Sequence, residues 1–120
     1  MHAVVESPDF AADAKVAGLG EAEVRRIVDH LARRPDAGDL IPGTGGARKV
    51  RFAGRGKGKS GGWRVITFYG GAGLPVFLLT VFGKGRKIDL TQAERNRLRR
   101  ELAGLAEDYR KGVRRHVGGG

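Results

Sequence analysis

The stretch Trp63-Arg64-Val65-Ile66-Thr67-Phe68-Tyr69 decides the fold, because β-branched and aromatic residues follow one another without a break. Glycines at 70–73 supply a turn, and residues 74–82 form a second strand that is apolar on both faces and therefore interior. Residues 48–53 form a strand on the other side, beyond the basic, glycine-rich segment 54–62. Three consecutive strands with short connections predict an antiparallel meander.

Along the chain, helices are predicted both before and after this meander. Residues 3–6 form a short strand, and a helix starts at Ser7-Pro8 because serine caps well and proline fits the first helical position. A second helix covers 21–34, with apolar residues at helical spacing, and Pro35 ends it. The sequence Thr91-Gln92-Ala93-Glu94 is a capping box that opens a final helix to about Lys111.

This order, β-α-α-β-β-β-α, predicts an α+β fold. We expect a small antiparallel sheet of about four strands, including the first strand, with helices packed on one face. The length of 120 residues predicts a single domain, residues 1–112, followed by a flexible basic and glycine-rich tail, 113–120.

The composition narrows the class of protein. There is no cysteine, which excludes disulfides and thiolate metal sites. The first residues lack the pattern of a signal peptide, and no run is long and apolar enough for a membrane span. We therefore expect a soluble cytoplasmic protein without membrane contact, metal or cofactor.

Positive charge is concentrated in the middle of the chain. The formal net charge is +10, yet no acidic residue lies between Asp39 and Asp89. The basic residues of this window are Arg48, Lys49, Arg51, Arg55, Lys57, Lys59, Arg64, Lys84, Arg86 and Lys87. A solvated loop that only aids solubility is one explanation. A window that contains basic residues and no acidic ones is more typical of a polyanion site, and nucleic acid is the commonest polyanion.

Strand pairing brings much of this charge together. If the last hairpin closes over 70–73, Tyr69 faces Leu74 and Lys84 lies opposite residues 59–61. If the preceding hairpin closes over 54–62, Ala53 faces Gly62 and Arg64 lies opposite Arg51. The residues predicted to gather at one end of the sheet are Arg51, Lys57, Lys59, Arg64, Lys84 and Lys87. Their mutual repulsion favours an anion among them.

The residue types in this window limit its chemistry. It contains no His, Asp, Glu or Cys, and His2, His30 and His116 lie outside it as surface or packing residues. A phosphate-binding P-loop around Gly58-Lys59-Ser60 is rejected, because Ala53 replaces the required glycine and a strand follows instead of a helix. Cleavage of RNA by its own 2′-OH remains open, since Lys and Arg stabilise the phosphate and a crowded Lys has a lowered pKa.

Two glycine-rich motifs resemble those of the RelE/HigB toxins of type II toxin–antitoxin systems, within the RelE/ParE superfamily. The first is Ile41-Pro42-Gly43-Thr44-Gly45-Gly46-Ala47-Arg48-Lys49-Val50-Arg51, and the second is Gly58-Lys59-Ser60-Gly61-Gly62-Trp63-Arg64-Val65-Ile66. Residues 79–94 are similar to the last strand and final-helix cap of these toxins. In element order the resemblance covers about residues 2–108.

The resemblance implies a RelE-like fold and an endoribonuclease that cuts translated mRNA on the ribosome and inhibits translation. It also implies a cognate antitoxin, often a helix-turn-helix protein, in a hetero-oligomer. By motif, Lys59 is a base or phosphate ligand and Arg64 stabilises the transition state. Lys84 and Lys87 hold phosphate or assist proton transfer. The residues expected to bind RNA phosphates are Arg48, Lys49, Arg51, Arg55, Lys57 and Arg86.

Some aromatic residues depart from the family pattern. Many RelE-type toxins add a Tyr to the site, but Tyr69 lies at the opposite end of the hairpin and Tyr109 on the core face of the final helix. Trp63 is expected to point into the core, and Phe82 is compatible with either face.

Two alternatives stay open. One is a related scaffold of ParE type that poisons DNA gyrase and cleaves nothing, and the other is a non-catalytic basic module that binds RNA or the ribosome. Few aromatic residues lie on the basic loops, which disfavours sequence-specific single-strand binding.

Overall fold

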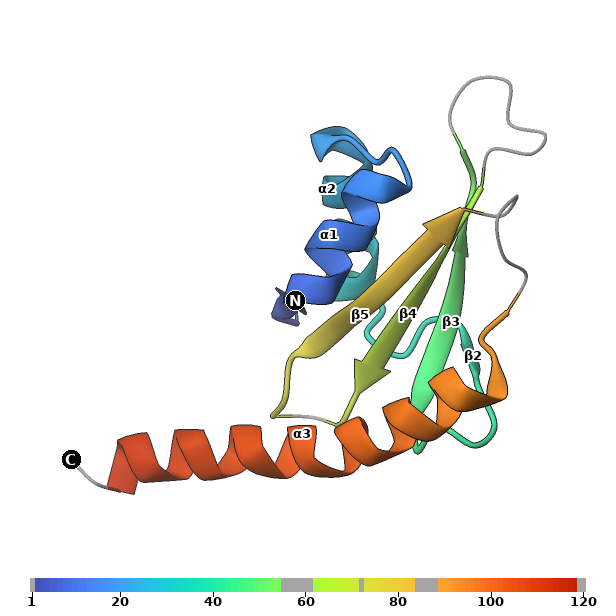
Figure 1. Cartoon of the computed structure of the whole chain (residues 1–120). Helices are drawn as coiled ribbons and strands as arrows, with labels where there is room; N and C mark the ends of the chain where they lie inside the picture. The colour runs from blue at the N-terminus through green and yellow to red at the C-terminus, as the bar shows by residue number, and fades with distance from the viewer. Residues whose placement is uncertain (1, 55–61, 72, 84–88, 119–120) are drawn as a thin grey trace.

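The computed structural model describes residues 2–54, 62–71, 73–83 and 89–118. It contains a five-stranded sheet and three helices, and the α+β class is as expected (Figure 1). In chain order the elements are β1 (Val4–Glu6), α1 (Pro8–Val16), α2 (Glu21–Arg33), β2 (Asp39–Leu40), β3 (Ala47–Phe52), β4 (Trp63–Tyr69), β5 (Val76–Gly83) and α3 (Gln92–Gly118).

The sheet is mixed, with the strand order β1-β5-β4-β3-β2. The meander β3–β4–β5 is antiparallel as predicted, but β1 joins β5 in parallel. The expectation of about four antiparallel strands was therefore wrong in count and in direction. The strand that sequence reasoning missed is β2, which consists of two residues and is too short to show an alternating pattern.

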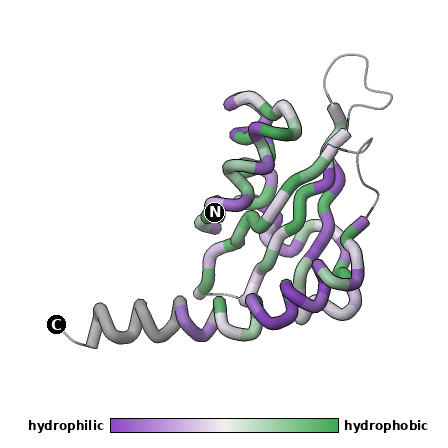
Figure 2. Tube along the Cα trace, in the orientation of Figure 1, coloured by the Kyte–Doolittle hydropathy of each residue, from purple (hydrophilic) through white to green (hydrophobic). Residues whose placement is uncertain are grey.

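The helices pack on both faces of the sheet, not on one as expected. In Figure 1, α1 and α2 lie together on one side, and α3 crosses the other side near the end where β4 finishes. One core cluster joins α1 and α2 to Val65 and Leu78, and a second joins α3 to Ile66 and Phe77. The physical reason is that β4 and β5 carry apolar side chains on both faces, and each face needs a cover. Figure 2 shows this as hydrophobic colour running through the central strands.

The pairing of β4 with β5 differs from the prediction. Tyr69 pairs with Val76 instead of Leu74, because the turn extends through Pro75, which lacks the N–H that a paired strand residue needs. An irregularity between Ile66 and Thr67 shifts the register further. As a result Phe82 lies opposite Arg64, where the expected register would place Leu79. The expected facing of Arg51 and Arg64 across β3 and β4 is confirmed.

The helix ends show how local sequence sets the elements. The Ser7 hydroxyl accepts a hydrogen bond from the Phe10 N–H at 3.1 Å, and Pro8 is the first residue of α1, as predicted. The capping box of α3 is present, with Thr91 and Glu94 bonded reciprocally at 2.8 and 3.1 Å. However, α3 continues to Gly118, beyond the end expected near Lys111.

A turn with a buried threonine joins β2 to β3. Thr44 is fully buried, and its hydroxyl donates to the Ile41 carbonyl at 2.7 Å and accepts from the Ala47 N–H at 3.0 Å. Gly46 follows with φ +120°, and a Cβ there would lie 3.2 Å from the Phe68 ring. This turn fixes where β3 begins, and so where the basic residues of β3 lie.

Candidate polyanion site

Three side chains form a row across the sheet, on the same face as α3. Arg51 on β3 pairs with Arg64 on β4, and Arg64 pairs with Phe82 on β5. Directly opposed residues of antiparallel strands point to the same face. Phe82 packs against the α3 core cluster, which identifies that face. The row therefore places two arginines and one aromatic residue on the same face of three adjacent strands, with Arg64 between Arg51 and Phe82.

The row lies on a part of the sheet that α3 leaves open. The helix packs on the other end of this face, over Ala47, Phe68 and Phe77, where β3 starts and β4 ends (Figure 1). Arg51 is exposed, and Arg64 and Phe82 are half-buried. An anion can therefore reach both guanidinium groups without displacing a described helix.

A second group of charges lies on the same face, next to the start of α3. Asp89 contacts Lys49 of β3, with 3.2 Å between Nζ and Oδ2, and Arg95 of α3, with 3.4 Å between Nη2 and Oδ2. The Leu90 N–H also donates to Asp89, at 2.8 Å. The carboxylate holds Lys49 of β3 and the first turn of α3 together, and so fixes where the helix begins on this face.

The pKa of Asp89 is lowered from its usual value. The hydrogen bond from the Leu90 N–H has the largest effect, burial opposes it, and Lys49 and Arg95 add to the lowering. Asp89 is therefore an anion at neutral pH and serves as a charged anchor. Arg95 retains a buried Nε that has no hydrogen-bond acceptor among the described residues.

The structure brings together some predicted site residues and separates others. Lys49, Arg51 and Arg64 share the α3 face. Arg48 alternates with them and lies on the α1 and α2 side, where it donates to the Gly38 carbonyl at 3.1 Å. Its contact ties β2 to β3 and does not serve the row. The predicted residues that lie outside the described ones are Arg55, Lys57, Lys59, Lys84, Arg86 and Lys87.

The aromatic and histidine residues mostly lie away from the row. Trp63 is in the α1 and α2 core, as predicted, with its Nε1 donating to the Ala17 carbonyl at 3.3 Å. His2 packs edge-on against Tyr69, and His30 against Phe52. Both histidines thus have the packing role expected of them. The side chains of Tyr109 and His116 lie outside the described part.

Sequence reasoning missed Asp89 and Arg95 as neighbours of the basic residues. The available signal was that Asp89 closes the acid-free window immediately before the α3 cap, at the end of the sheet's last connection. Its contact with β3, however, depends on α3 lying on that face of the sheet. The sequence pattern did not predict which face of the sheet α3 covers.

The described residues contain no cluster of three or more His, Cys, Asp or Glu that could hold a metal ion. Nor does any described helix combine the length and apolar character needed to cross a membrane. A search against protein-family models finds no match for this chain.

Proposed function

We propose that this protein is the toxin of a type II toxin–antitoxin system and cleaves mRNA on the ribosome without a metal. The row Arg51–Arg64–Phe82 is the observation that supports this most directly. A phosphate that lies between two opposed arginines can accept charge-assisted hydrogen bonds from both guanidinium groups. The adjacent ring offers a base a surface for stacking. Phosphate and base are neighbours in RNA, so the arginines of the row can bind a phosphate while its aromatic ring stacks on the adjacent base.

The reaction is attack by the 2′ oxygen on the adjacent phosphorus. A base removes the 2′ proton, the O2′–P bond forms, the P–O5′ bond breaks, and an acid returns a proton to O5′. In this proposal Arg64 neutralises the charge that grows on the phosphate oxygens, and Arg51 holds the flanking backbone. Lys59 is a base or a phosphate ligand, and Lys84 and Lys87 hold phosphate or assist proton transfer, as the family resemblance implies.

The partners in this proposal are translated mRNA, the ribosome and a cognate antitoxin of helix-turn-helix type. A nuclease built from Lys and Arg is slow without help, because an always-charged arginine is a poor acid. Positioning of the RNA by the ribosome supplies that help. The neighbourhood of the row is cationic, which suits a polyanionic target such as the decoding region.

The test is induced expression of the wild type beside Arg64→Ala, with mapping of new mRNA 5′ ends. We expect growth arrest with cuts inside translated codons for the wild type. Arg64→Ala should lower cleavage about 100-fold or more, the usual effect of removing one transition-state donor. The matched control is Arg33→Ala, which removes an exposed arginine on α2, on the other side of the sheet.

Other outcomes identify the alternatives. Arrest without new mRNA ends, unaffected by Arg64→Ala, would favour a gyrase poison of ParE type. RNA or ribosome binding without arrest or cleavage would favour a non-catalytic module. Circular dichroism of each purified variant establishes that loss of activity is not loss of folding.

A further inference from the structure

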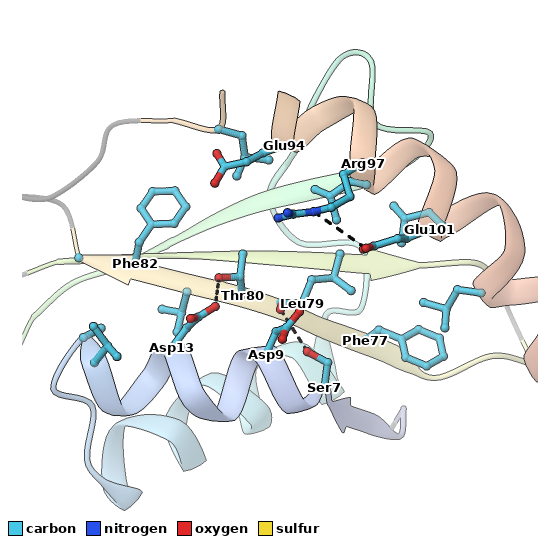
Figure 3. Close-up of a pocket in the computed structure, with 18 residues that line it drawn as sticks. Ser7, Asp9, Asp13, Phe77, Leu79, Thr80, Phe82, Glu94, Arg97 and Glu101 are labelled. Atoms are coloured by element: carbon cyan, nitrogen blue, oxygen red, sulfur yellow. Dashed lines mark hydrogen bonds and ion pairs between the residues drawn. The ribbon is translucent and has the colours of Figure 1, made fainter. Parts of the chain in front are cut away.

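A groove on the described part of the molecule meets the arginine row only at Phe82. It has a volume of about 850 Å³ and runs along β5 between α1 and α3. Figure 3 shows Asp9 and Asp13 of α1 on one side, and Arg97 and Glu101 of α3 on the other. The floor is apolar and includes Leu79 of β5. The groove is therefore a trough whose floor is one strand of the sheet.

That strand has an open edge within the groove. β1 pairs with β5 only as far as Leu78, opposite Glu6. The Ser7 hydroxyl then donates to the Leu79 carbonyl at 3.1 Å, and the chain continues as α1, which packs beside β5. From Thr80 to Gly83, β5 has β4 as its only strand neighbour among the described residues. One side-chain contact reaches this edge from α1: the Thr80 hydroxyl donates to Asp13 Oδ2 at 2.5 Å. Such an edge presents backbone groups that can pair with another extended chain.

The charge of the groove is opposite to that of the protein. The chain has 23 basic and 13 acidic residues. The ionisable residues that line the groove are Asp9, Asp13, Glu94, Glu101 and a single cation, Arg97. Arg97 already lies 4.0 Å from Glu101, so the rim is acidic on balance. At about 0.1 M salt charges act over about 10 Å, so this local rim outweighs the distant positive charge.

We propose that the groove binds an extended segment of a partner protein, which adds as a strand to the open edge of β5. The segment alternates apolar residues, which face the floor, with Lys or Arg, which face the acidic rim. The apolar floor selects apolar side chains, the open edge selects an extended backbone, and the acidic rim selects basic side chains. The proposal does not depend on the proposed ribonuclease activity, because the groove and the arginine row share only the flank of Phe82.

A second copy of this chain is a poorer occupant. The opposite edge of the sheet is β2, which has two residues and begins with Asp39. An acidic strand of that length neither spans the open part of β5 nor complements an acidic rim. A separate basic segment satisfies both conditions.

The test uses a labelled, end-blocked peptide of about six residues, a usual strand length, in which Leu and Val alternate with Lys and Arg. Fluorescence anisotropy measures its binding to the full chain. A second peptide carries N-methyl groups on the backbone nitrogens of alternate residues, which removes strand pairing but keeps the side chains. We expect N-methylation to raise the dissociation constant of the peptide about tenfold or more.

Two matched variants locate the binding site. Val16 lines the groove at the end of α1 and is 67% exposed, so Val16→Lys adds a cation there without disturbing the core. Lysine in the last turn also suits the helix dipole. Leu40→Lys makes the same kind of change on β2, where Leu40 is 59% exposed. We expect Val16→Lys to weaken peptide binding about fivefold and Leu40→Lys to leave it unchanged.

Three results would overturn the proposal. These are equal binding of the N-methylated peptide, equal effects of the two variants, or no binding at about millimolar peptide. Sedimentation of the chain alone adds a fourth: a dimer that Val16→Lys dissociates would make a second copy the occupant. Val16 lies outside the arginine row, so Val16→Lys should cleave RNA as the wild type does. Measuring its RNA cleavage beside its peptide binding therefore distinguishes an error in the groove proposal from an error in the proposed ribonuclease activity.

Discussion

At the scale of single residues, Asp89 is the acidic group that organises the basic face. It contacts Leu90, Lys49 and Arg95 at once, and its pKa is lowered, first through the Leu90 N–H and then through the two cations. A lowered pKa in the folded state means that the charged carboxylate stabilises the fold above its unfolded pKa of about 3.9. That stabilisation is lost as the pH falls through the lowered value.

We therefore expect Asp89→Asn to flatten the acid limb of the stability profile. Between pH 5 and pH 3, the wild type should lose more unfolding free energy than the variant, by about 0.5 kcal/mol, because the carboxylate is partly exposed and screened. Urea unfolding at several pH values measures this difference. Asp36→Asn, at an exposed loop position, is the matched control, and identical profiles for all three proteins would contradict the expectation.

At the same scale, substitutions of two buried threonines are expected to have opposite effects on stability. Thr44 has both hydrogen bonds of its hydroxyl satisfied, whereas Thr67, equally buried, has no partner for its hydroxyl among the described residues. Thr44→Val leaves the Ala47 N–H and the Ile41 carbonyl without their partner, which should cost about 1–3 kcal/mol of stability. Thr67→Val replaces a hydroxyl by a methyl of similar shape and should be neutral or stabilising. Denaturant midpoints compare the two; a larger loss in Thr67→Val would show that its hydroxyl has a partner.

At the scale of elements, the first glycine-rich motif has a structural role. Residues 43–46 form the turn that Thr44 closes, with Gly43, Gly45 and Gly46 at positive φ. This turn sets the start of β3 and, through the fixed pairing with β4, the position of Arg51 opposite Arg64. This part of the motif therefore contributes to the site through the backbone.

The sequence predicted most elements but not all of their partners. The strand 63–69 and the pairing of Arg51 with Arg64 followed from residue type and from counting outward across one loop. The pairing of β4 with β5 did not, because Pro75 lengthens the turn and the irregularity at Ile66 and Thr67 has no sequence mark. This difference in register is the reason why Phe82, and not Leu79, lies opposite Arg64. The side taken by α3 was also unpredictable, because β4 is apolar on both faces.

At the scale of the whole molecule, one sheet separates two cores. Ile27 is fully buried in the α1 and α2 cluster, and Ile66 is fully buried in the α3 cluster. We expect Ile27→Val and Ile66→Val each to cost about 0.5–1.5 kcal/mol of stability. Because the two side chains lie on opposite faces, the double variant should show the sum within about 0.5 kcal/mol.

Denaturant unfolding followed by both fluorescence and circular dichroism tests this expectation. A single coincident transition in all variants would show that the shared sheet couples the cores into one cooperative unit. Two transitions, one moved by each substitution, would show that either helical layer melts separately from the sheet.

The parallel pairing of β1 with β5 has a consequence for synthesis. During synthesis β1 cannot take its place in the sheet until β5 has also left the ribosome, since Ser7 bonds to Leu79 across a separation of 72 positions. Closing so long a loop slows folding. The newly made chain therefore carries β1 and α1 without their final partner until β5 has been made, and the sheet with its arginine row closes only after that point.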